Sequence, residues 1–214
     1  MPRPKALVRV GAFLDYPVSP EAAYWAGFLL ADGGVRAGSR SGGATLAVSL
    51  QTRDRAHLAS LRDFLCPSAQ ITSGHEGRAV RLQVYGQEIV LALARFGIVP
   101  RKTYLDVMPL LHIAEEVPFI RGYFDGDGCV GIYKTQGRPY PHWILVGGQR
   151  WLTFVRDLLA EPAGSMGSLR QVGSIWRLSY VGRAVPWIID WLAGDPSLER
   201  KRLIERAILE GSYA

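Results

Sequence analysis

The chain repeats itself at a shift of about 95 residues, and no other feature of the sequence constrains its fold as strongly. Four landmarks recur at nearly the same offset: Asp32 and Asp127, "LRDFL" (61–65) and "VRDLL" (155–159), "RLQVYG" (81–86) and "RLSYVG" (177–182), and "RKT" (101–103) and "RKR" (200–202). A solenoid needs three or more repeats to bury its core. Two copies in 214 residues therefore predict two similar halves related by a pseudo-twofold axis.

Each copy predicts the same order of elements, αββαββα. In the first copy, Ser19 is expected to cap a helix that starts at Pro20 and ends at Gly33. The matching helix is expected to start near Pro118 and to end at Gly128. The predicted strands alternate apolar and polar residues, and a helix separates the two strand pairs of each copy. The strands of the first copy are 44–51 and 78–86. Those of the second copy are 129–136, 142–148, which follows a Gly-Arg-Pro turn, and 174–182.

This pattern indicates an α+β fold with antiparallel sheets, each with one apolar face and one polar, arginine-bearing face. An ordinary solvated sheet surface would also explain the polar faces. We place an N-terminal extension at residues 1–18, the first repeat at 19–112 and the second repeat at 113–214.

Both leading helices end on a carboxylate, in "WAGFLLADG" (25–33) and "RGYFDGDG" (121–128). The C-terminus of a helix carries partial negative charge, so an Asp there costs about 0.3–1 kcal/mol. Small residues recur every four positions along one face of each helix, which would let the helices pack closely: Ala23, Gly27 and Ala31 in the first, Gly122 and Gly126 in the second. Such packing would bring the two terminal carboxylates side by side.

Two neighbouring carboxylates repel each other unless a cation lies between them, and a hard divalent metal with oxygen ligands meets this need. Asp32 and Asp127 are therefore predicted metal ligands, with Mg²⁺ as the commonest intracellular candidate. The alternative is that both are Asp-Gly turns, in which a left-handed glycine ends the helix.

Arginine greatly outnumbers lysine among the basic residues of the chain. The formal net charge is +6, which favours a polyanionic partner, yet only four of the 25 basic residues are lysines. Two of them, Lys102 and Lys201, occupy matching places in the copies, each after an arginine. Because the pKa of a lysine can fall on burial, either could orient or activate a water or neutralise charge at phosphorus. A phosphate clamp or a solvated surface charge is the alternative.

The two motifs, together with "GIVPRKTY" before the second copy, resemble the paired signature of the LAGLIDADG homing endonucleases in their single-chain, two-repeat form. The resemblance covers the chain from about residue 20. It implies a saddle of two four-stranded sheets over duplex DNA, with the motif helices as the central interface. It also implies that Asp32 and Asp127 bind the catalytic metals, with backbone carbonyls from Ala31 and Gly126. The implied metal is Mg²⁺, with Ca²⁺ as a non-cleaving substitute and Mn²⁺ as a further candidate.

The resemblance further implies catalytic-pocket roles for Lys102 and Lys201 and a polar residue at the end of the second strand of each repeat, near the attacking water. Gln149 is the candidate in the second copy, and Gln51 or Asp54 in the first; a loop or helix-cap role is the alternative for all three. Asp125 departs from the pattern because its counterpart is Leu30, so we expect a structural group there rather than a ligand.

The polar sheet faces would enter the major groove, where Arg reads guanine and Gln reads adenine. The candidate DNA contacts are Arg36, Arg40, Thr45, Ser49, Arg81, Gln83, Lys134, Gln136, Arg138, Arg170 and Arg177. Because these residues differ between the copies, the recognised site is expected to be long and asymmetric. The implied activity is site-specific hydrolysis of double-stranded DNA by a monomer. An intron RNA maturase and a catalytically silent DNA-binding regulator on the same fold are the alternatives.

Several other classes of protein are excluded by the sequence. No apolar run approaches the roughly 20 residues that span a bilayer, so no membrane partner is expected. The first residues lack the pattern of a signal peptide. Cys66 and Cys129 are isolated, so neither a zinc site nor a disulfide scaffold is indicated. We expect an intracellular protein that acts in the cytoplasm or at the nucleoid.

Overall fold

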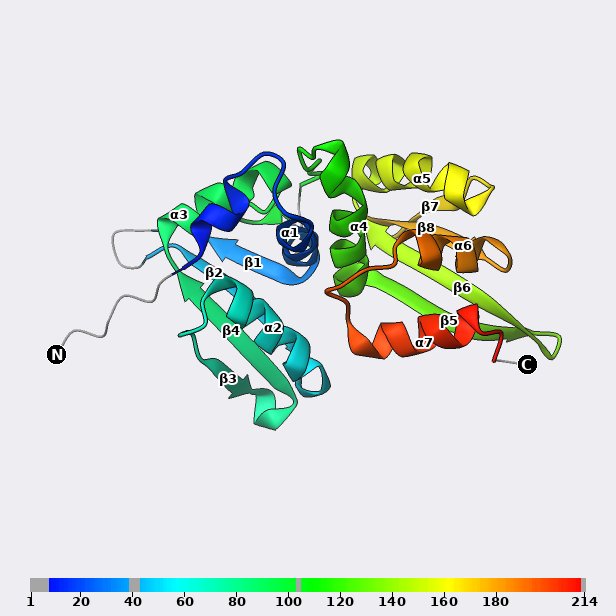
Figure 1. Ribbon diagram of the computed structural model, residues 1–214, viewed down its shortest axis with the longest axis horizontal. Helices are drawn as coiled ribbons and strands as arrows, with labels where there is room; N and C mark the ends of the chain where they lie inside the picture. The colour runs from blue at the N-terminus through cyan, green and yellow to red at the C-terminus, as the bar shows by residue number, and fades with distance from the viewer. Residues whose placement is uncertain (1–7, 39–42, 103–104, 213–214) are drawn as a thin grey trace.

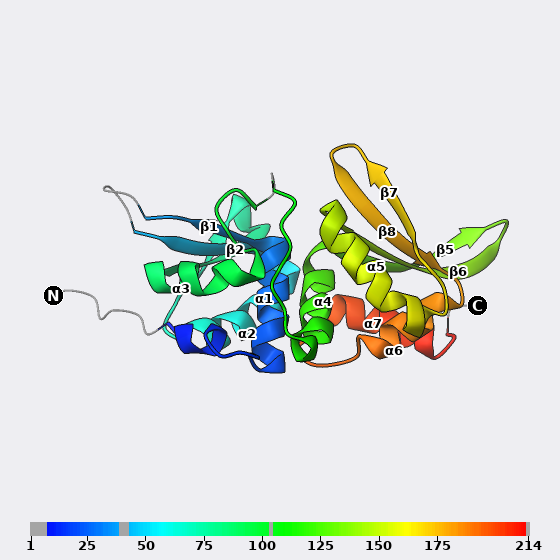
Figure 2. The ribbon, with the colours of Figure 1, turned by 90° about the horizontal axis from the view of Figure 1, so that it is seen from above.

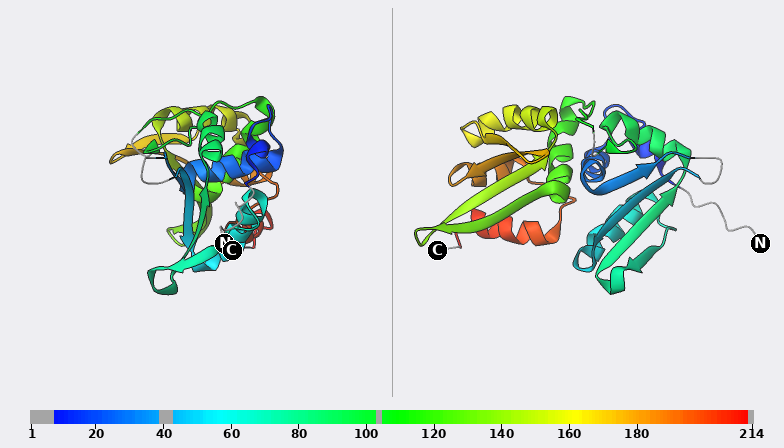
Figure 3. Two further views of the ribbon diagram at one scale, coloured as in Figure 1. Left: turned by 90° about the vertical axis from the view of Figure 1, so that its left-hand side faces the viewer. Right: turned by 180° about the vertical axis from the view of Figure 1, so that it is seen from behind.

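The computed structural model describes residues 8–38, 43–102 and 105–212. Two α+β halves lie side by side, and one long helix from each half, α1 (Pro20–Asp32) and α4 (Ile113–Asp127), lies between them (Figures 1 and 2). Seen from behind, the two sheets flank this central helix pair (Figure 3). The predicted α+β class with two related halves is confirmed.

Each half contains a four-stranded antiparallel sheet with the same topology, β1-β2-β4-β3 in the first and β5-β6-β8-β7 in the second. The elements of the first half are β1 (Gly33–Arg36), β2 (Thr45–Gln51), α2 (Arg55–Leu65), β3 (Ile71–Gly74), β4 (Ala79–Tyr85) and α3 (Gln87–Ala92). Those of the second half are β5 (Gly128–Thr135), β6 (Arg138–Gly147), α5 (Gln149–Ala163), β7 (Ser168–Val172), β8 (Ile175–Val181), α6 (Ala184–Trp191) and α7 (Glu199–Leu209).

The α1–α4 contact depends on one glycine in each helix. A methyl group at Gly27 would overlap the carbonyl oxygen of Phe119, and one at Gly122 would overlap that of Tyr24. These two contacts are related by the 95-residue shift, so the interface has pseudo-twofold symmetry. Backbone touches backbone here, as the small-residue stripes predicted.

The second central helix starts earlier than the sequence indicated. It begins at Ile113, five residues before Pro118, and Pro118 lies inside it. His112 caps the helix, and the Glu115 side chain accepts from the His112 backbone at 2.9 Å, completing a capping box. Glu115 also accepts from Val18 N (2.7 Å) and Arg95 (2.9 Å), which ties this helix end to the first half. Proline misled the prediction because it often marks a first helical position.

The β5–β6 turn also differs from the prediction. It consists of Gln136 and Gly137, with φ of 49° and 77°, so both residues are left-handed as a two-residue type I′ turn requires. Arg138 and Pro139 belong to β6 rather than to the turn.

One face of each sheet is buried under its own helices. Leu46, Val48, Val80 and Leu82 supply this face in the first half, and Trp143, Leu145, Leu178 and Tyr180 in the second. The opposite face of each sheet, called the open face below, carries the alternating polar residues. Within the described ranges, no helix is long and apolar enough to cross a membrane.

Candidate active site

The two terminal carboxylates lie next to each other at the paired ends of α1 and α4. A methyl group at Gly126 would touch the Ala31 side chain and lie 3.4 Å from Asp32 Oδ2, so the end of α4 rests directly against Asp32. Asp127 follows at the next position. The close packing at Gly27 and Gly122 thus delivers Asp32 and Asp127 to one place, as the sequence predicted.

Crowding makes these carboxylates hard to ionise. Asp32 reaches the surface, but the protein packed around it removes solvent, and together with the charge of Asp127 this raises the pKa of Asp32 to about 6. Loss of solvent also raises the pKa of Asp127, against the opposing effects of Lys102, Lys201 and the neighbouring Tyr123 hydroxyl. The positive charge near Asp32 and Asp127 is therefore too weak to offset the effects that raise their pKa values.

The glycines that follow the two Asp residues do not act as left-handed helix caps. Gly33 has φ −78° and ψ 142°, and Gly128 has φ −96° and ψ 163°, so both begin extended strands. A methyl group at Gly33 would lie 2.5 Å from Leu29 O, and one at Gly128 would overlap Phe124. Close backbone approach is the reason for glycine, and the turn interpretation of both Asp-Gly pairs is wrong.

The two lysines explain how helices can end on the unfavourable charge. Lys102 Nζ donates to Leu30 O and to Ala31 O (2.9 Å) at the end of α1. Lys201 Nζ donates to Phe124 O, Asp125 O (2.9 Å) and Gly128 O (2.6 Å) at the end of α4. Each lysine thus places a cation on carbonyls at the negative end of its helix.

Burial changes the acidity of both lysines. It lowers the pKa of Lys201, whose side chain is almost fully buried, to about 8, and it lowers the pKa of Lys102 as well. Three backbone carbonyls accept from Lys201, which accounts for all three of its N–H donors. Its charge can therefore act on the carboxylates through space, but all three of its N–H groups already donate to backbone carbonyls.

The donor set fits a divalent metal of the Mg²⁺ or Ca²⁺ type. Both cations prefer oxygen ligands, and Mg²⁺ is commonly held by one or two carboxylates with water and phosphate completing its shell. Asp32 and Asp127 provide two carboxylates, and neither forms an ion pair within the described residues. No cluster of three or more His, Cys, Asp or Glu side chains suited to a metal occurs in the described part of the chain, which argues against a closed protein cage.

One of the two backbone carbonyls predicted to bind metal already accepts a hydrogen bond. Ala31 O already accepts from Lys102, so only its second lone pair would be free for a metal. Gly126 lies beside Ala31 at the helix contact. The backbone of both residues is at the site.

The three candidates for water positioning lie in the connections between a strand and the helix that follows it. Gln51 ends β2 and Gln149 begins α5, and both are exposed. Asp54 is nearly buried and accepts from Arg200 Nε at 3.2 Å, across the two halves. Because this ion pair occupies Asp54, Gln51 is the freer of the two candidates in the first copy.

The strand register sorts the candidate DNA contacts by face. Seven of the predicted side chains are exposed or half-buried on the open faces: Arg36, Ser49, Arg81 and Gln83 in the first sheet, and Arg138, Arg170 and Arg177 in the second. Gln136 lies exposed at the β5–β6 turn. Arg40 lies outside the described residues.

Two of the predicted contacts are not presented on the open faces. Thr45 is on the open face by register, but it is buried and its hydroxyl donates to Gly43 O at 3.2 Å. Lys134 pairs with Pro139 and so shares the helix-covered face with Val130 and Ile132. Strand alternation from Cys129 would have shown this, because side chains two residues apart point the same way.

The open face of the second sheet also carries an aromatic group that the sequence analysis missed. Tyr133, Tyr140 and His142 lie with ring centroids 5.2–6.4 Å apart. They share the alternating positions of β5 and β6 with Arg138. The same period-two pattern could have identified them.

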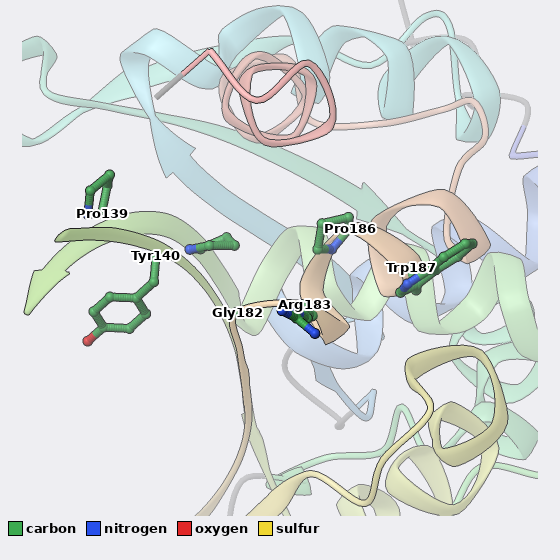
Figure 4. Close-up of a pocket in the computed structure, with 7 residues that line it drawn as sticks. Pro139, Tyr140, Gly182, Arg183, Pro186 and Trp187 are labelled. Carbon is green, nitrogen blue, oxygen red and sulfur yellow. The ribbon is translucent and has the colours of Figure 1, made fainter. Parts of the chain in front are cut away.

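A cavity in the second half lies away from the carboxylates. It measures about 490 Å³ and lies between the turn end of β6 and the start of α6, lined by Pro139, Tyr140, Pro141, Gly182, Arg183, Pro186 and Trp187 (Figure 4). Pro139 and Gly147 are eight positions apart on β6, so roughly 26 Å of strand separates this cavity from the site end of the sheet.

Comparisons with known proteins agree on the fold. No family model and no curated protein sequence matches the chain. Among solved structures, the LAGLIDADG meganuclease I-AabMI bound to uncleaved DNA is similar, with a TM-score of 0.65, 14% identity and 91% of each chain covered. I-SmaMI bound to uncleaved DNA with calcium ions gives 0.62, 11% identity and coverage of 92% of this chain and 93% of that one.

A third structure, the LAGLIDADG homing endonuclease I-GzeII in complex with its DNA target, gives a TM-score of 0.58 at 10% identity, with 91% of this chain and 92% of that chain covered. These matches span nearly the whole length of both partners and include both halves. The chain therefore has the fold of the LAGLIDADG meganucleases, in the form that carries both repeats in one chain.

Proposed function

We propose that this protein is a site-specific double-strand DNA endonuclease that hydrolyses phosphodiesters with a divalent metal and acts as a monomer. The observation that carries the proposal is the meeting of Asp32 and Asp127 at the paired helix ends, between two sheets with arginine-bearing open faces. The three structural neighbours described above were all solved with DNA, which supports the same partner here.

Each residue of the site has a proposed role. Asp32 and Asp127 would hold Mg²⁺, which when bound would supply charge neutralisation at the scissile phosphate and an activated water. Lys102 and Lys201 hold the two helix ends in place and reduce the negative charge around the carboxylates. Because the protons of Lys201 are committed to carbonyls, its proposed role is electrostatic rather than that of a general base.

The flanking polar residues have proposed roles in water positioning and DNA contact. Gln51 and Gln149 are the proposed water-positioning residues. The exposed open-face residues would contact the major groove, and the aromatic group of Tyr133, Tyr140 and His142 would add apolar contacts in the second half. The unlike open faces support recognition of a long, asymmetric site.

Calcium binding is expected to weaken as the pH falls through about 6. Protons and metal compete for the same carboxylates, and the pKa of Asp32 is raised to about 6 in the folded chain. Isothermal titration calorimetry with Ca²⁺ alone, between pH 5 and pH 8, measures this. Affinity should be constant above pH 7 and fall about tenfold for each pH unit well below 6. Affinity independent of pH over this range would contradict binding by Asp32.

Selection from a randomised duplex library tests the activity itself. The chain is incubated with the library and Mg²⁺, and cleaved molecules are sequenced. A long, non-palindromic consensus, lost when EDTA is added, is expected. The same reaction with Asp127→Asn controls for contaminating nucleases. Binding to duplex DNA without cleavage would instead identify a silent regulator, and binding to structured RNA alone would identify a maturase.

A further inference from the structure

A buried network of five polar side chains crosses the α1–α4 interface behind the candidate site. Tyr24 donates to Asp125 Oδ2 at 2.7 Å, and Arg121 donates to Asp125 Oδ1 at 3.2 Å. Arg121 also donates to both carboxylate oxygens of Glu205, at 2.8 and 2.9 Å. His57 Nε2 lies 3.1 Å from the Tyr24 oxygen. Buried charges of this kind are tolerated only when they are paired and hydrogen-bonded, as these are.

The proton positions in the network follow from its geometry. The single hydroxyl proton of Tyr24 goes to Asp125, so His57 must donate its Nε2–H to the Tyr24 oxygen. Burial lowers the pKa of His57 to about 4, so its ring is neutral at pH 7. Arg121 is then the cation of the network, and Asp125 and Glu205 are its anions.

The network attaches α7 to α4 on both sides of Lys201. Asp125 Oδ2 accepts from the backbone N–H of Leu198, which precedes α7, at 2.8 Å. Glu205, one turn beyond Lys201 on the same helix face, is held by Arg121. Lys201 lies between these two attachments and reaches the carbonyls at the end of α4.

Among the described residues of the first repeat, no equivalent network surrounds Lys102. The counterparts of Tyr24, His57, Arg121 and Asp125 at the 95-residue shift are all apolar: Phe119, Leu152, Ala26 and Leu30. Lys102 has 3₁₀ conformation, whereas Lys201 lies in the α-helix α7. The two halves therefore fix equivalent lysines by different means.

We infer that Arg121, Asp125 and Glu205 are positioning residues that hold Lys201 at the end of α4, so that cleavage of one DNA strand depends on this network and cleavage of the other does not. The inference rests on the proposed nuclease function of the site. It follows from the contacts within the described residues, where Lys201 bonds to carbonyls of the Asp127 half and Lys102 to carbonyls of the Asp32 half.

Lysine labelling tests the positioning without DNA or metal. Reductive methylation followed by peptide mass spectrometry reads each of the four lysines separately. Lys201 is 2% exposed and should react slowly, while exposed Lys134 provides an internal reference. Glu205→Gln should raise the methylation rate of Lys201 at least about tenfold relative to that of Lys134. Removing one partner of a buried charged pair weakens the local structure by about this factor or more. An unchanged rate at Lys201 would overturn the inference.

Glu115→Gln provides the matched control. Glu115 is also a buried carboxylate paired with an arginine, and it lies in the first turn of α4, at the end opposite to the Lys201 contacts. This variant should lose stability as Glu205→Gln does and leave Lys201 protected. If Lys201 is exposed equally in both variants, general loosening explains the result and the inference fails.

Strand-specific cleavage tests the functional consequence. A duplex recovered from the library, with a different dye on each strand, reports the two cuts separately. Glu205→Gln should slow one cut by about 10- to 100-fold, the range expected from a small misplacement, and leave the other within about twofold, so that nicked duplex accumulates. Equal slowing of both cuts would contradict the inference. If Glu205→Gln does not fold, Tyr24→Phe is tested in its place. This variant mimics Phe119 of the other repeat and should give the same strand bias to a smaller degree.

These two readouts separate the inference from the proposed function. If the native chain cleaves no duplex, the nuclease proposal fails, whereas the labelling result still decides whether the network holds Lys201. If the native chain cleaves and the labelling rates do not change, only the positioning role fails.

Discussion

Replacing Asp32 with Asn is expected to abolish DNA cleavage and, above pH 6, to make the folded chain more stable. Cleavage should fall by at least about 10³-fold, as when a strong electrostatic contact to a transition state is removed. Asp127→Asn should abolish cleavage in the same way. Loss of activity with a gain in stability is characteristic of a functional site that is kept at a cost to the fold.

The sign of the stability change follows from the raised pKa of Asp32. Because the folded chain holds the proton up to about pH 6 and the unfolded chain releases it near pH 4, ionisation of Asp32 destabilises the fold as the pH rises through this range. Asn cannot ionise, so the variant should gain on the order of 1 kcal/mol above pH 6, allowing for solvent screening at this exposed position. The gain should vanish below pH 4.

Thermal unfolding at pH 4 and pH 8 without added metal measures this gain, and a Tm increase of about 2–4 °C is expected at pH 8 only. Asp63→Asn is the control, because Asp63 is an exposed carboxylate paired with Arg62 on α2 and should change neither activity nor stability. Retained cleavage in Asp32→Asn, or a loss of stability at pH 8, would contradict the assignment.

Gly122→Ala is expected to have the largest effect on the fold. The new methyl group would overlap the carbonyl oxygen of Tyr24 and lie 2.8 Å from its carbonyl carbon and 2.9 Å from Phe28 N, all of which are backbone atoms that no rotamer change can move. The helices must separate, so the expected destabilisation is at or above the usual ~3 kcal/mol for overpacking a core. Separation of the helices would also move Asp32 away from Asp127, so this variant should lose calcium affinity as well as stability.

Urea unfolding followed by tryptophan fluorescence measures the destabilisation. Gly11→Ala, at a position with no heavy atom near the added methyl group, should unfold at the native midpoint. Gly27→Ala should behave like Gly122→Ala because the two contacts are equivalent. A Gly122→Ala chain with the native midpoint would show that α1 and α4 do not pack as described.

The parts of this molecule that the sequence predicts well are those that one local pattern determines. Small residues at every fourth position predicted the close packing of α1 on α4 at Gly27 and Gly122, and Ser19-Pro20 predicted the start of α1. Strand alternation predicted which side of each sheet Arg81 and Arg177 occupy.

The features that the sequence did not predict depend on contacts between distant segments. Lys102 and Lys201 were expected near the carboxylates, but their role on the helix-end carbonyls requires knowing where the chain returns after the sheet. Asp125 was expected to be structural, yet its partners Tyr24 and Leu198 lie 101 and 73 residues away. The His112–Glu115 capping box indicates the early start of α4, but Pro118 suggested a later first residue.

The position of the metal tests the central claim most directly. The chain is crystallised with Ca²⁺ and a duplex recovered from the library, and the metal is located by its anomalous scattering. We predict calcium bound by both the Asp32 and Asp127 carboxylates, against phosphate oxygens at the centre of the duplex. Carboxylates that bind no metal, or a metal held elsewhere on the chain, would contradict the account.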